Sequence, residues 1–147
     1  MDSVNRRSNL WRTFYLFLAA LFVLFVTTSV LASGRGTAVY TVNTTADTTD
    51  GACTQAHCSL REAIQAANAL PSGNAIIQFK VGTLSTVVIF PTSPLPAITN
   101  SVLLKTNLNN TIDVVLDGSQ AGPADGLILA GNVITLRDLA IQNWQGS

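Results

Sequence analysis

The stretch VITLRDLAI at residues 133–141 carries the apolar pattern that says most about the fold. Ile134 and Leu136 lie two residues apart, so they share one face of a strand, and Leu139 and Ile141 share a face in the same way. The step between the two pairs is odd, so a straight strand would place the pairs on opposite faces of a sheet.

A bend at Arg137–Asp138 would return both pairs to one interior. Short strands joined by bends, with their apolar side chains stacked in one column, are typical of a parallel β-helix. A sandwich strand that is covered on both faces is the alternative. Further short apolar runs, separated by Asn, Asp, Gly, Pro and Ser, favour a mostly β architecture; they lie at 38–42, 77–81, 87–90, 102–104, 112–116 and 127–129.

One helix is predicted after Ser59, because Glu62 follows three residues later in a capping-box pattern. The next apolar residues recur at helical spacing and form one stripe; they are Leu60, Ala63, Ile64 and Ala67. The sequence LPSGN at residues 70–74 ends the helix, since proline disfavours helical geometry in the residue before it and glycine allows the chain to turn.

The N-terminus has the three parts of a secretion signal. Basic residues precede Phe14, an uncharged apolar run extends to Val26, and small residues lead to a predicted cleavage site after Ala32. The alternative is an uncleaved anchor over residues 14–32, which is just long enough to cross a bilayer. Both interpretations place the rest of the chain outside the cytoplasm.

The two cysteines, Cys53 and Cys58, are therefore expected to form a disulfide, since thiols outside the cytoplasm oxidise. His57 is the only histidine, and no second cysteine pair exists to complete a zinc site, so we predict neither a metal nor a cofactor. We expect His57 to be exposed. Asp47 and Asp50 could offer oxygen ligands to calcium, but a polar turn explains them better.

The number and placement of charged residues also limit the functions that the sequence can support. After residue 32 the acidic residues slightly outnumber the basic ones, and no basic cluster exists, so nucleic acid is not an expected partner. A glycosidase would need paired carboxylates. The candidates for such chemistry, Asp113, Asp117, Asp125, Arg137 and Asp138, fit turns or a solvated face better. Tyr40 and Trp144 could stack on sugar rings, although packing in the protein explains them more simply.

The run CSLREAIQAAN at residues 58–68 resembles the signature of the CSLREA domain family. The preceding YTVNTTADTTDG at 40–51, with Cys53, and LPAIT at 95–99 are similar to other parts of that family, and residues 125–143 resemble first β-helix rungs. The resemblance implies a bacterial secreted or surface protein. It also implies that the motif caps the N-terminal end of a right-handed parallel β-helix of the pectin-lyase-like type.

From this we expect a signal peptide over residues 1–32, a cap with the motif and one helix over 33–74, and about two incomplete β-helix rungs over 75–147. Because solenoids need about three stacked repeats, we expect the chain to be a fragment of a longer solenoid.

The expected function is non-catalytic. It is adhesion, surface structure or contact with surface glycans or other cell-surface proteins, at the cell surface or after secretion, with the membrane involved only through the signal segment. The alternatives are a secreted polysaccharide lyase or hydrolase and a membrane-anchored structural module, because one fold can carry different functions.

Export can be tested by the intact mass of protein recovered from an oxidising export host. We expect a species that starts at Ser33 and is about 2 Da lighter than its reduced form, because the disulfide removes two hydrogens. A full-length species with free thiols would contradict both the cleavage and the disulfide.

Overall fold

The computed structural model describes residues 36–82, 86–106 and 113–146. The signal segment, the cleavage site after Ala32 and the alternative anchor lie outside the described residues. The elements in chain order are β1 (Thr37–Val42), α2 (Leu60–Asn68), β2 (Asn74–Phe79), β3 (Thr86–Ile89), β4 (Ser101–Lys105), β5 (Asp113–Asp117), the 3-10 turn η1 (Gly118–Gln120), β6 (Ile134–Arg137) and β7 (Leu139–Gln142). The prediction of a mostly β chain with a helix after Ser59 is confirmed.

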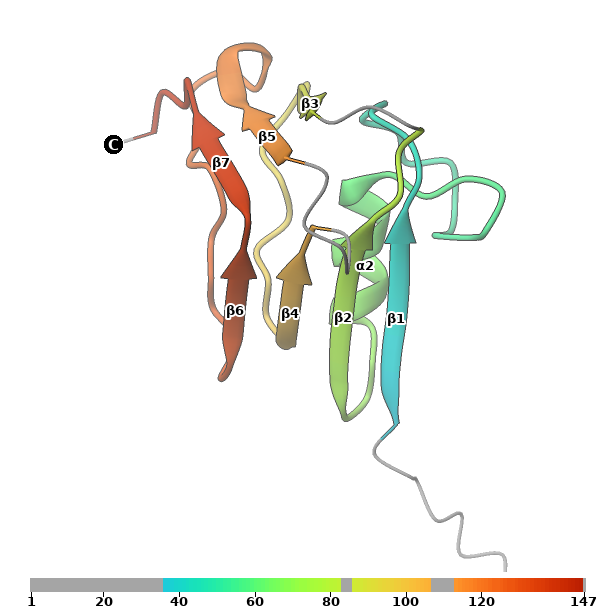
Figure 1. The fold of residues 1–147 in the computed structure, drawn as a ribbon. Helices are drawn as coiled ribbons and strands as arrows, with labels where there is room; N and C mark the ends of the chain where they lie inside the picture. Colours follow the sequence, from blue (N-terminus) through green and yellow to red (C-terminus); the bar gives the residue numbers. More distant parts are fainter. Residues whose placement is uncertain (1–35, 83–85, 107–112, 147) are drawn as a thin grey trace, which may run out of the picture. The chain divides into compact units, whose positions relative to one another are not determined.

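The strands form two sheets in which every pairing is parallel (Figure 1). One sheet has the order β1-β2-β4-β6 and the other β3-β5-β7. Asn74 pairs with Ser101 and Thr86 with Asp113, so the chain returns after 27 residues in both sheets (101 − 74 and 113 − 86). Parallel neighbours require such long connections. The sheets are open at both edges, so pairing alone does not close them into a β-helix.

Outside the two sheets, a single parallel bridge forms where the sequence predicted a strand at 127–129. That prediction was wrong, because only an isolated parallel bridge forms there, between Ile98 and Leu129. The Ile98 amide donates to the Ile128 carbonyl at 2.8 Å, and the Ala130 amide donates to the Ile98 carbonyl at 2.8 Å. Within the described residues, no partner strand runs beside the apolar triplet, so no ladder forms there, and Ile128 and Leu129 remain exposed.

The bend predicted between the apolar pairs of residues 134–141 is present. Asp138 separates β6 from β7 and has a φ of 55°, a left-handed conformation that Asp tolerates better than most residues. All four apolar side chains of this stretch fall in register with residues buried in the preceding strands. The pairs are Val102 with Ile134, Leu104 with Leu136, Val114 with Leu139 and Leu116 with Ile141.

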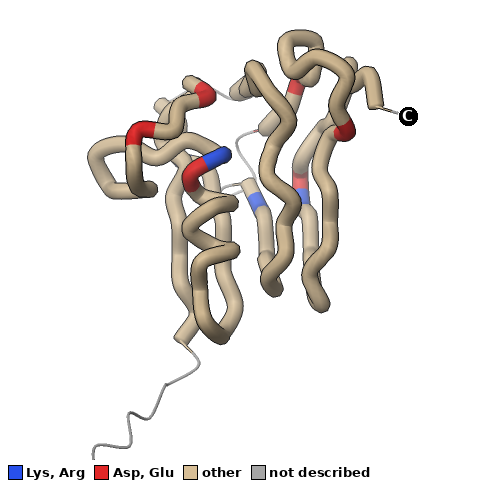
Figure 2. The backbone as a smooth tube through the Cα atoms, turned by 180° about the vertical axis from the view of Figure 1, so that it is seen from behind, with Lys and Arg blue, Asp and Glu red and all other residues tan. Residues whose placement is uncertain are grey.

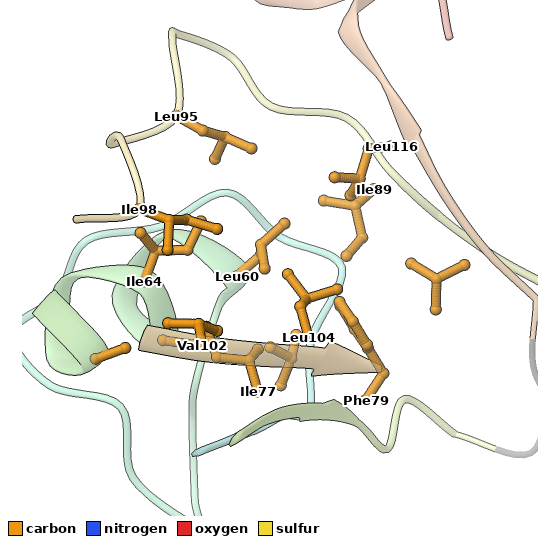
Figure 3. Close-up of a cluster of buried hydrophobic side chains, with 14 of the residues drawn as sticks. Leu60, Ile64, Ile77, Phe79, Ile89, Leu95, Ile98, Val102, Leu104 and Leu116 are labelled. Atoms are coloured by element: carbon orange, nitrogen blue, oxygen red, sulfur yellow. The ribbon is translucent and has the colours of Figure 1, made fainter. Parts of the chain in front are cut away.

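The core is a single cluster that joins both sheets to the helix (Figure 3). The predicted apolar stripe of α2 is confirmed, since Leu60, Ala63, Ile64 and Ala67 are all buried. The helix packs against β1 and β2, and Leu60 and Ile64 lie in the same cluster as inward residues of β4. The buried face of α2 thus covers inward side chains of the sheet that begins with β1.

Alternation along β4 gives a direct stability test. Leu104 is fully buried in the column, whereas its neighbour Leu103 points outward and is only half-buried. Leu104→Ala should lower the free energy of unfolding by about 2–5 kcal/mol, because it leaves a cavity in a packed core. Leu103→Ala is the matched control, and urea denaturation measures both. Equal losses in the two variants would mean that the inward face of β4 is misassigned.

Candidate functional site

The loop between β1 and α2 is closed by covalent and hydrogen bonds. The predicted disulfide between Cys53 and Cys58 is confirmed. The Asn43 amide donates to the Cys58 carbonyl at 3.1 Å, and the Cys58 amide donates to Asn43 Oδ1 at 2.8 Å. The two ends of this loop, residues 43–58, are therefore held side by side. We call residues 43–58 the cap loop.

The N-terminus of α2 is held by the predicted capping box, which the structure confirms. The Glu62 amide donates to Ser59 Oγ at 3.2 Å, and the Ser59 amide donates to Glu62 Oε2 at 2.9 Å. Two further bonds reach back into the cap loop. Ser59 Oγ donates to the Thr48 carbonyl at 2.7 Å, and the Asp50 amide donates to Glu62 Oε1 at 3.0 Å. Glu62 thus fixes the cap loop as well as the helix.

The Glu62 carboxylate is ionised although its side chain is only 2% exposed. Burial by itself raises the pKa of a carboxyl group, since it penalises the charged form. Here hydrogen bonds from Ser59 and Asp50 outweigh burial and lower the pKa of Glu62 from 4.5 to about 2. The first turn of α2 therefore keeps a buried negative charge beside the cap loop at any pH above about 3.

Arg61 joins the cap loop to the segment after β3. Its Nε and one terminal nitrogen donate to the two Asp47 oxygens, both at 2.8 Å. The guanidinium also donates to the carbonyls of Pro94 at 2.7 Å and Ser93 at 2.9 Å. Bidentate pairs of this kind fix geometry as well as adding energy. Arg61 is therefore a structural residue that clamps three parts of the chain.

Both carboxylate oxygens of Asp47 accept hydrogen bonds. Its side chain is 3% exposed, and Oδ2 accepts the Thr92 amide at 2.8 Å in addition to the Arg61 bond. Burial raises the pKa of Asp47, but the bonds from Arg61 and Thr92 outweigh it and hold the pKa below the usual value. Asp47 and Asp50, the calcium candidates of the sequence, thus have different partners, and Asp50 lies with His57 and Glu62.

His57 lies between two carboxylates. Its Nδ1 is 3.2 Å from Asp50 Oδ2 and 3.5 Å from Glu62 Oε2, and Nε2 is 3.4 Å from Thr48 Oγ1. The side chain is 35% exposed, but the Nδ1 atom itself is buried. Both carboxylates are within ion-pair distance, yet neither is aligned to form a hydrogen bond with Nδ1. His57 is thus less exposed than the sequence suggested, and its polar atom faces inward.

The carboxylates further along the chain have separate surroundings. Asp117 is buried and accepts from the Ser119 amide at 3.0 Å, from Gln142 at 3.0 Å and from Asn143 at 2.8 Å. These bonds, with Gln142 the largest contributor, hold the pKa of Asp117 far below its usual value. Asp117 therefore stabilises the turn that follows β5. The remaining candidates, Asp113, Asp125, Arg137 and Asp138, are exposed.

The two aromatic candidates for sugar stacking are engaged in the fold. The Tyr40 hydroxyl donates to the Ala66 carbonyl of α2 at 3.2 Å. Trp144 packs against the hydrophobic core and lies over Gly118 and Gly126 so closely that a Cβ at Gly118 would overlap its ring. Packing accounts for both side chains.

No protein-family model, curated protein or solved structure matches this chain. The resemblance to the CSLREA family therefore stays a prediction. Within the described residues, no helix combines the length and the apolar content needed to cross a bilayer.

Sequence reasoning named Asp50, His57 and Glu62 separately but did not bring them together. The spacing of six and four intervening residues matches no common ligand motif. The signal that could have found the cluster is the disulfide, because the Cys53–Cys58 bridge folds His57 back toward the helix start where Glu62 lies.

The lowered pKa of Glu62 predicts an acid-sensitive cap. Because its folded pKa of about 2 lies below the unfolded value of 4.5, Glu62 stabilises the fold fully above about pH 5 and loses that contribution as the pH falls toward 2. Glu62→Gln should destabilise the protein at pH 7 by about 1–3 kcal/mol and flatten its stability between pH 5 and 2. Urea denaturation across that range measures this, with Asp113→Asn as the exposed control. A pH profile unchanged in Glu62→Gln would contradict the assignment.

Proposed function

We propose that this chain is the capped N-terminal part of a right-handed parallel β-helix that works outside the cytoplasm as a non-catalytic glycan-binding surface protein. The observation that supports it best is the parallel pairing of successive strands in two sheets, with the Ile98–Leu129 bridge as a third line of contact. Three lines of parallel contact are what three-sided β-helix rungs would produce.

The cap loop supports the extracytoplasmic part of the proposal. A disulfide between Cys53 and Cys58 persists only where thiols are not kept reduced. The helix that follows buries its whole apolar stripe against the stack, as a terminal cap of a solenoid must.

The charged residues favour binding over catalysis. Figure 2 shows that Lys, Arg, Asp and Glu are few and spread along the described backbone. Asp117 uses its oxygens for the turn after β5, and Asp113 at the start of β5 is exposed at the other end of that strand. For the candidate carboxylates from β5 onward, this distribution gives little support to the paired acid and base that a glycosidase requires.

A polar depression offers a surface for a glycan. It has a volume of about 570 Å³ and is lined by Thr41, Asn43, Gln55, Gln78 and Lys80. These hydroxyl, amide and ammonium groups can donate to and accept from sugar hydroxyls. Gln78 already donates to Thr41 at 3.0 Å, so part of the lining is fixed before any ligand binds.

Binding and turnover can be separated in one experiment on the exported, oxidised protein. We expect retention on insoluble polysaccharides (pectin, alginate or peptidoglycan) without new reducing ends or unsaturated uronides. Replacing both Gln55 and Lys80 with Ala should weaken retention about tenfold, because two polar contacts are lost. Gln120→Ala, at an exposed position of η1, is the matched control.

Sustained product release by the wild-type protein would overturn the non-catalytic proposal in favour of a lyase or hydrolase. Absence of retention on all three polysaccharides, with specific capture by a cell-surface protein, would replace the glycan by a protein partner.

A further inference from the structure

Three side chains of different types converge where the cap loop meets the start of α2. His57 Nδ1 lies 3.2 Å from Asp50 Oδ2 and 3.5 Å from Glu62 Oε2, and the ligand atoms of all three residues lie within 4.8 Å of one another. Among the described residues, this is the group of three or more His, Cys, Asp or Glu side chains that is close enough to share one cation.

The spacing fits metal coordination. Zn²⁺ binds nitrogen and carboxylate oxygen at roughly 2.0–2.2 Å, so two ligands of a tetrahedral site lie about 3.4 Å apart. The two distances from His57 Nδ1, 3.2 and 3.5 Å, fall on either side of that value. A cation could therefore contact all three atoms with small side-chain movements.

The two carboxylates of the cluster carry negative charge that a bound cation could balance. Among the described residues, the ion pairs of Asp50 and Glu62 involve only His57, because Arg61 is paired with Asp47. A buried charge is normally paired or bound to a metal. Two carboxylates and a neutral imidazole would balance a divalent cation, and the buried Nδ1, which lacks an aligned hydrogen-bond partner, provides a lone pair for it.

The surroundings hold the three ligands in place. Glu62 is fixed by the amides of Ser59 and Asp50, each of which uses one oxygen and leaves a lone pair on it. His57 stands next to Cys58 of the disulfide, and its amide donates to Thr54 Oγ1 at 3.2 Å. The Asp50 side chain is 60% exposed, so this side of the cluster is open to an entering ion and to water as a further ligand.

We propose that Asp50, His57 and Glu62 form a binding site for a divalent first-row transition cation, with Zn²⁺ as its representative. Imidazole nitrogen suits Zn²⁺ and its neighbours, whereas Ca²⁺ takes six to eight oxygen ligands. The ion would link the cap loop to the first turn of α2 and add to the work of the disulfide. The site does not depend on the proposed glycan binding.

A protonated His57 that bridges the two carboxylates is the competing explanation of the same geometry. An imidazolium offers no lone pair at Nδ1, so it excludes the metal. The two explanations therefore differ in whether the protein binds Zn²⁺ through His57.

The test is a calorimetric titration of the exported, oxidised and untagged protein with ZnCl₂ at about pH 7.5, together with thermal unfolding with and without Zn²⁺. The disulfide must stay intact, since free thiols bind zinc themselves. We expect one Zn²⁺ per chain, a raised unfolding temperature, and no displacement by a large excess of Ca²⁺.

Variants show whether these ligands are responsible. Asp50→Asn keeps the backbone bond to Glu62, so the cap remains, and His57→Gln keeps a polar side chain. Each should weaken Zn²⁺ binding at least about tenfold and remove the Zn²⁺-dependent rise in unfolding temperature. Asp138→Asn, at an exposed turn outside the cluster, should bind like the wild type. No binding by the wild type, or unchanged binding in both ligand variants, would overturn the proposal.

Discussion

Parallel stacking of strands makes every inward side chain depend on the strand above it and the strand below. Ile77 needs Leu104, and Leu104 needs Leu136, because each is covered only when the register places one over the next. A stack that simply stops exposes main-chain groups and apolar side chains, which invites aggregation. Here α2 packs against β1 and β2 and adds Leu60 and Ile64 to the same core. At β7, by contrast, Ile141, the register partner of the buried Leu116, is 42% exposed.

The first turn of α2 carries most of the polar contacts that hold this cover in place. Arg61 and Glu62 are adjacent in sequence but point to different partners. Arg61 reaches Asp47 and the carbonyls of residues 93–94, and Glu62 reaches the amides of Ser59 and Asp50. Both side chains are largely buried, so the loss of either would leave unpaired groups, which costs more than the bond itself. The polar residues of the run at 58–68 therefore stabilise the fold just as its apolar residues do.

Local patterns predicted the parts of the structure that depend on neighbours in sequence. The helix start follows from Ser59 and Glu62, and the bend at Asp138 follows from the parity of the flanking apolar pairs. The partners of Arg61 could not be read in this way, since they lie 14 to 33 residues away and depend on how the strands stack. The false strand at 127–129 shows the same limit, because an apolar triplet forms a ladder only where a partner strand runs beside it.

The candidate metal cluster escaped sequence reasoning for a related reason. Asp50, His57 and Glu62 converge only because the disulfide and the Asn43–Cys58 bonds fold the cap loop back on the helix. The cap loop and the first turn of α2 therefore combine a covalent link, a buried ion pair and a group of potential ligands within about twenty residues. These constraints lie beside β1, the edge strand of the four-stranded sheet, which among the described residues is paired on one side only.

Disulfide trapping across neighbouring strands tests the in-register stack most directly. Leu103 of β4 and Thr135 of β6 are register partners on the outward face, and adjacent strands lie about 4.8 Å apart, within reach of a disulfide. The double variant Leu103→Cys/Thr135→Cys should oxidise within one chain, which peptide mass mapping would detect beside the native Cys53–Cys58 link. Leu103→Cys/Arg137→Cys, shifted by two residues on the same face, should not. Efficient cross-linking of the shifted pair, with none in the aligned pair, would contradict the stacked parallel register.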